Sequence, residues 1–166
     1  MSVPRLLHRS AALIALMFAF GAVLVGAQAG SASPGQVIKV DVTGTVLTCA
    51  EDGSTYTITS GTAVFVFHES TDPAGGDHVT GTTAPMHVTL SHSTDDLTYR
   101  LVGASWFGGN FRGEGGTFTD LEHFVIMGPS GGPAANISII AHFTANAQGV
   151  VTVDFVKDSG TCTPAD

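Results

Sequence analysis

The chain has few basic residues and few cysteines, and each shortage excludes a class of function. Only six of its 166 residues are lysine or arginine, against 14 aspartates and glutamates. Because basic side chains supply most of the affinity for phosphates, we expect no nucleic acid partner, and binding to an anionic membrane surface is disfavoured. The sequence also contains no C-x-x-C pair. We therefore expect no metal and no cofactor, and no catalytic motif stands out.

The first 29 residues have the three parts of a secretory signal. Arg5 and Arg9 form a basic start, residues 11–25 are uncharged, and residues 27–29 (Ala-Gln-Ala) have the small-x-small pattern of a cleavage site. Two glycines interrupt the apolar run before it reaches the roughly 20 residues of a membrane anchor. We expect cleavage after Ala29, a secreted protein without a membrane anchor, and one β domain over residues 30–166.

The two cysteines, Cys49 and Cys162, have no partner motif around them. In an oxidising compartment such an isolated pair predicts one structural disulfide. It would close a loop of about 113 residues and contribute on the order of 4 to 5 kcal/mol in the chain-entropy model.

Apolar and polar residues alternate with a period of two from residue 36 onward, as in Ile38, Val40 and Val42. No stretch of ten or more residues after the signal carries a helical stripe. The pattern predicts strands at 36–42, 55–60, 62–69, 78–92, 98–107, 116–127, 136–145 and 150–157. Turn residues predict loops at 51–53, 60–61, 72–77, 93–96, 108–110, 128–133 and 146–149.

This arrangement predicts an all-β antiparallel fold of seven to nine strands, either an up-and-down barrel or a two-sheet sandwich. Glycines inside strands at 44, 81 and 103 favour a curved or closed sheet. Gly61 as a bend would give seven strands, and a turn at Pro85 would give nine. Residues 62–67 are apolar on both faces, which predicts either a covered central strand or a contact between copies of the chain.

The segment 103–112 is the richest in recognition residues. It holds the only tryptophan, two phenylalanines and an arginine beside three glycines. Tryptophan and arginine are enriched where surfaces bind, so we expect ligand binding by Trp106, Phe107, Phe111 and Arg112 around a loop at 108–110. A closed barrel would favour a small lipophilic molecule, and a flat tryptophan patch would favour a glycan.

Acids and histidines offer weaker candidates. The loop at 72–77 is predicted to be a solvated acidic turn, although its acids with His68, Glu69 and His78 leave a metal site open. Asp120 and Glu122 share a strand face that we expect to be exposed, whereas His123 points to the other face. Convergence in one pocket of two or more side chains from a set of six would favour an enzyme: Glu69, His87, Asp120, Glu122, His123 and His142.

Three short motifs carry a resemblance: Gly-Thr-Val-Leu-Thr-Cys at 44–49, Gly-Ala-Ser-Trp-Phe-Gly-Gly at 103–109 and Gly-Thr-Cys at 160–162. With them the chain resembles the small secreted two-cysteine β proteins of high-GC Gram-positive bacteria. The resemblance implies secretion and a disulfide-stapled β fold, and it implies no activity.

The leading functional hypothesis is a secreted, non-catalytic binding or interaction module. A structural or envelope-associated oligomer is the first alternative. A small β-barrel isomerase or hydrolase is the second.

Overall fold

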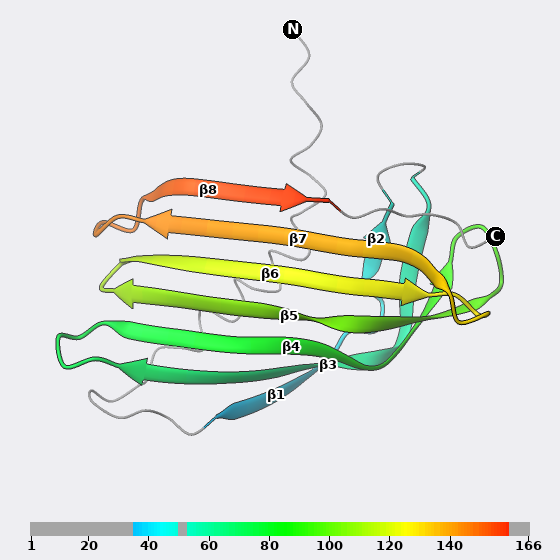
Figure 1. Ribbon diagram of the computed structural model, residues 1–166, viewed down its shortest axis with the longest axis horizontal. Coiled ribbons are helices and arrows are strands. Elements are labelled where there is room, and N and C mark those ends of the chain that lie inside the picture. The colour runs from blue at the N-terminus through cyan, green and yellow to red at the C-terminus, as the bar shows by residue number, and fades with distance from the viewer. Residues whose placement is uncertain (1–34, 50–52, 160–166) are drawn as a thin grey trace, which may run out of the picture.

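The structure is a computed structural model that describes residues 35–49 and 53–159. These residues form eight strands and no helix (Figure 1). The strands are β1 (Gln36–Asp41), β2 (Val46–Thr48), β3 (Thr55–Thr71), β4 (Asp77–His92), β5 (Thr98–Arg112), β6 (Gly115–Met127), β7 (Pro133–Ala145) and β8 (Val151–Asp158).

All eight strands belong to one antiparallel sheet in the order β1-β3-β4-β5-β6-β7-β8, with β2 also paired to β3. The prediction of an all-β antiparallel fold with seven to nine strands is confirmed. The barrel is wrong, because closure would require pairing between β1 and β8, and these two are the opposite edges of the described sheet. The strands also do not divide into the two separate sheets of a sandwich.

The predicted turn at residues 60–61 is a bend inside a single strand. β3 runs for 17 residues, about 56 Å if it were straight, and its register with β4 shifts between Ile58 and Thr62. Gly61 lies there with φ 130°, and a Cβ atom on it would come within 2.5 Å of the Val88 Cα atom. Only glycine fits this conformation and this close approach.

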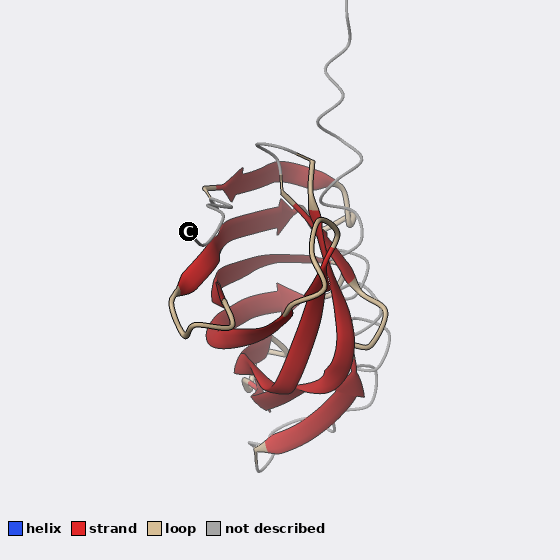
Figure 2. Ribbon diagram, turned by 90° about the vertical axis from the view of Figure 1, so that its right-hand side faces the viewer, coloured by secondary structure: helices blue, strands red, loops and turns tan. Residues whose placement is uncertain are grey.

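The bend continues across the neighbouring strands. β1 and β2 lie end to end along β3, and Gly44 separates them with φ 86°. In β4, residues 84–88 have no partners on β5, and His87 has φ 54°. This gap accommodates Pro85, which has no amide proton to donate. β2 and the adjoining part of β3 therefore turn away from the long strands (Figures 1 and 2).

The hydrophobic core lies where the bent part of the sheet covers the flat part. Nine buried residues form it: Cys49, Tyr56, Ile58, Val88, Leu90, Tyr99, Ile126, Ala134 and Ala135. Their hydrophobic side chains come from both sides of the bend, so burial of this apolar surface holds the two parts together.

The predicted loop at 108–110 is also wrong, because β5 continues to Arg112. Arg112 pairs with Gly115, which leaves Gly113 and Glu114 as a two-residue hairpin turn. Gly113 has φ 59°, as tight hairpin turns require. The predicted loops at 72–77, 93–96, 128–133 and 146–149 do separate strands.

Two predictions fall outside the described residues. Cys49 is buried in the core, but Cys162 lies beyond residue 159, so the disulfide stays a prediction. The expected signal peptide, residues 1–29, also lies outside the described ranges. In the part of the chain that the structure describes, no helix could span a membrane.

Candidate binding site

The four residues predicted to bind a ligand lie on opposite faces of the sheet. Successive side chains of a strand alternate in direction, so Trp106 and Arg112 share one face of β5 while Phe107 and Phe111 share the other. We call the face that carries Phe107 and the core residue Ile126 the inner face, and the face that carries Trp106 the outer face. The four side chains therefore do not share one face of the sheet, and their role in ligand binding stays a prediction.

Trp106 is exposed near the middle of the outer face. Its side chain retains 45% of its accessible surface. The strand registers align it with six outer-face residues in one row across the sheet: Val37, Val66, Thr82, Leu121, Ile140 and Lys157. The four aliphatic members of this row are also exposed. The outer face thus presents an indole in a row of exposed side chains that is mostly apolar.

The glycine pair at 108–109 allows two aromatic rings to lie against the sheet. A Cβ atom on Gly108 would come within 3.0 Å of the Trp106 indole, and one on Gly109 would come within 2.7 Å of the Phe111 ring. The first contact is on the outer face and the second on the inner face. Glycine in a strand often marks such a close approach, which explains why this sequence forms a strand and not a loop.

A groove of about 430 Å³ lies beside the indole on the outer face. Trp106 forms one of its walls, and Gly108 and Gly109 contribute backbone to it. Most of its other lining side chains can donate or accept hydrogen bonds: His68, Glu69, Ser70, His78, Thr80, Asn110, Thr117 and Thr119. The groove therefore combines one flat aromatic surface with several polar groups.

The polar end of the groove is held by the turn between β3 and β4. The Asp72 carboxylate accepts hydrogen bonds from the backbone amides of Ala74 (2.7 Å) and Gly76 (2.9 Å). Its other oxygen lies 3.3 Å from Nε2 of His78. The hydrogen bond from Gly76, followed by smaller contributions from Ala74 and His78, lowers the pKa of Asp72. These hydrogen bonds hold the acidic turn in place.

Arg112 contacts the same turn and does not line the groove. Its guanidinium donates a hydrogen bond of 2.9 Å to the carbonyl of Ala74. Among the described residues, no group of three or more histidine, cysteine or acidic side chains is arranged to hold a metal ion.

The inner face carries two buried acids that the sequence analysis expected to be exposed. Asp120 is 0% exposed and Glu122 is 6% exposed. Asp120 lies between Phe107 on β5 and Ala141 on β7, and the Phe107 ring stacks on Phe118 at 6.2 Å. Burial raises the pKa of Asp120 to about 6, while hydrogen bonding from Glu122 and the Leu121 amide opposes the rise.

The other acids and histidines considered for catalysis do not join this pair. His123 and His142 lie on the outer face, with His142 bonded to Thr119 at 2.8 Å. His87 lies in the bend of β4. Glu69 has inner-face register but lies three strands away from Asp120, and it lines the groove. Of the six side chains considered for catalysis, only Asp120 and Glu122 therefore lie next to each other, and both are buried from solvent.

The strand at 62–67 is not covered on both faces. Phe67, on the inner face, is 5% exposed, whereas Val66, on the outer face, is 39% exposed. The pairing with β1 and β4 covers the edges of β3 and leaves its outer face open. Of the two alternatives predicted for this strand, coverage of both faces within the chain is therefore wrong, and a contact between copies of the chain stays a prediction.

One polar cluster was missed by the sequence analysis. The Tyr99 hydroxyl donates to Asp95 at 2.9 Å, and Asp95 also lies 3.1 Å from Nδ1 of His92. The His92 ring stacks on Tyr56 at 4.4 Å. Burial, then the hydrogen bond to Asp95, raises the pKa of Tyr99 to about 12. The spacing of His92, Asp95 and Tyr99 around a short loop was the sequence signal that could have predicted this cluster. Its hydrogen bonds connect the ends of β4 and β5 across their hairpin loop.

Comparisons with protein-family models, curated proteins and solved structures found no match for the chain. The resemblance to small secreted two-cysteine proteins therefore stays a prediction.

Proposed function

We propose that this protein is a secreted, non-catalytic binding module that holds a glycan on the outer face of its sheet. The single observation that carries the proposal is the exposed Trp106 indole, which lies over Gly108 beside a groove with a polar lining. Sugar rings present flat C–H faces edged by hydroxyls, and they bind where an aromatic ring and hydrogen-bonding groups lie side by side.

The shape of the sheet favours a glycan over a small lipophilic molecule. Lipophilic ligands in β proteins usually occupy the enclosed interior of a closed barrel. The sheet here is open, and the groove beside Trp106 is lined largely by polar side chains. Threonine, histidine and asparagine can exchange hydrogen bonds with hydroxyl groups.

The test is calorimetric titration with neutral cello-, xylo-, manno- and chito-oligosaccharides of four to six sugars. At least one should bind, and Trp106→Ala should weaken it about tenfold or more because the stacking surface is lost. Trp106→Phe should retain part of the affinity. Leu121→Ala is the matched control, because Leu121 is exposed in the same row but does not line the groove. Absence of binding to every sugar in the set, and to acidic oligosaccharides as well, would refute the proposal.

A second candidate function is assembly through the outer face. Val66, Leu121 and Ile140 are each about 40% exposed in one row, and contiguous exposed apolar surface often marks an interface. Light scattering over a dilution series tests this candidate, and a strict monomer at all concentrations would remove it.

A further inference from the structure

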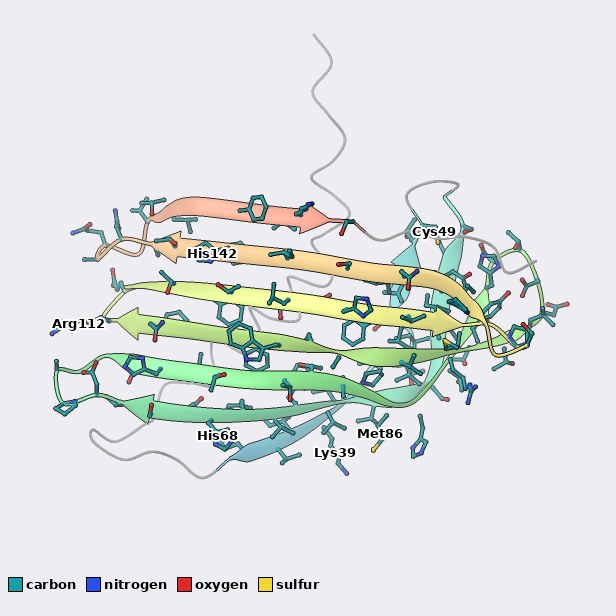
Figure 3. All side chains as sticks on the ribbon, in the orientation of Figure 1. Lys39, Cys49, His68, Met86, Arg112 and His142 are labelled. Carbon is teal, nitrogen blue, oxygen red and sulfur yellow. The ribbon has the colours of Figure 1, made fainter. Side chains whose placement is uncertain are left out.

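Three side chains that can carry positive charge lie on or beside the outer face at the polar end of the groove. His68 on β3 and His78 on β4 line the groove. Arg112 lies at the end of β5 (Figure 3), two residues beyond Asn110, and the alternation of side chains along the strand places it on the same face. The sheet thus concentrates basic groups here, although the whole chain has only six lysines and arginines.

The contacts of His78 suit the charged imidazolium. Its Nδ1 faces Oδ1 of Asn110 and its Nε2 faces Oδ2 of Asp72, so both ring nitrogens face acceptors. Only the protonated ring can donate from both nitrogens. The hydrogen bond to Asn110, followed by that to Asp72, raises the pKa of His78. With its oxygen occupied, the Asn110 side chain has its NH₂ group left to donate.

Few acids oppose this positive charge near the groove. Asp72 is occupied by two backbone amides and His78. Glu69 has inner-face register but lines the groove, and burial raises the pKa of its carboxyl. Asp77 has inner-face register and accepts a hydrogen bond from the Thr71 hydroxyl. His142 lies on the outer face, where its Nδ1 is 2.8 Å from the hydroxyl oxygen of Thr119. More distant acids of this acidic chain count for less, since exposed charges are screened over about 8 Å at physiological salt.

We propose that the groove takes an acidic glycan, in which a sugar ring stacks on Trp106 and a neighbouring uronate carboxylate lies between His68 and the Asn110–His78 pair. This inference rests on the proposed glycan-binding function and names its ligand class. His68 contacts the carboxylate directly, whereas His78 acts through its charge and by orienting Asn110. Binding is strongest in mildly acidic solution, where histidines as a class are charged.

The test compares tetragalacturonate with its fully methyl-esterified form, which has the same rings without charge. The fluorescence of Trp106, the only tryptophan in the chain, reports binding. At pH 5.5 the acid should bind about three- to fivefold more tightly than the ester, the range expected for exposed ion pairs. At pH 7.5, or at pH 5.5 in 1 M salt, the two affinities should converge.

Two variants locate the effect. His68→Lys should keep the preference for the acid at pH 7.5, because lysine stays charged there. His78→Gln should reduce the preference for the acid over the ester at pH 5.5. Equal affinity for acid and ester at pH 5.5 overturns the inference but leaves the proposed function standing, as does binding of neutral oligosaccharides alone. If no sugar of either kind binds, both proposals fail.

Discussion

Replacement of Asp120 by asparagine should stabilise the protein at neutral pH. Asp120 is fully buried on the inner face, with a pKa raised from 3.8 to about 6. A carboxyl with a raised folded-state pKa favours folding below its unfolded pKa, and this contribution is lost as the pH rises through the folded value. Stability from this group therefore falls between about pH 4 and pH 6, and asparagine, a neutral isostere, removes the dependence.

The magnitude follows from the size of the shift. About two pKa units at 1.36 kcal/mol each give roughly 3 kcal/mol, an upper value because Glu122 shares the site. The Asp120→Asn variant should exceed the parent by about that amount at pH 7.5, by about half of it at pH 5, and by little at pH 4.

The assay is urea unfolding at these three pH values, followed by far-ultraviolet circular dichroism. Asp154→Asn is the control, because Asp154 has inner-face register on β8 but is exposed. A stability difference between variant and parent that does not change with pH would refute the reasoning, as would a variant less stable than the parent at pH 7.5.

Three further predictions test the sheet and the site. Gly108→Val should displace the Trp106 indole, shift its fluorescence and weaken glycan binding while circular dichroism stays unchanged; unchanged fluorescence would contradict the contact. Tyr99→Phe should cost about 1 kcal/mol in urea unfolding, because the hydrogen bond to Asp95 is lost; an unchanged midpoint would contradict this. Gly103→Ala should cost about 2 kcal/mol or more, since a Cβ atom there lies 2.3 Å from a backbone oxygen of β6 at φ 121°; Gly113→Ala, with open space around it, is the control for conformational cost alone.

The strands could be predicted from the sequence because the outer face is largely exposed. When only one face of a sheet is buried, apolar and polar residues alternate along each strand. The alternation is clearest in β1, where Ile38 and Val40 point inward between exposed residues. The turns at 72–77 and 146–149 could also be predicted from the sequence, because Asp72 and Asn146 accept hydrogen bonds from the backbone of their own turns. Such local hydrogen bonds depend on a few adjacent residues and need no tertiary information.

The closure of the sheet could not be predicted in the same way. Glycines indicate that a strand bends, but a bend serves a barrel and an open folded sheet equally well. The outcome depends on whether β1 and β8 meet, which is a contact between residues more than 100 positions apart. The sequence associated Gly44, Gly81 and Gly103 with curvature and left a bend at Gly61 as the alternative to a turn. Gly44, Gly61 and Gly103 have positive φ, whereas Gly81 does not.

The geometry predicted for the candidate site, a loop at 108–110, was wrong because a pair of glycines in a sequence can have either of two structural causes. Paired glycines usually mark a loop, since they supply positive φ. Here Gly108 and Gly109 lie within β5, and neither has positive φ. Their missing side chains make room for Trp106 on one face and Phe111 on the other. The two causes differ in what lies two residues away: an aromatic ring at position i−2 or i+2 shares the face of the glycine and can cover it. Trp106 before Gly108, and Phe111 after Gly109, both satisfy this spacing, so the same segment that suggested a recognition loop contained the signal for a strand that displays its tryptophan.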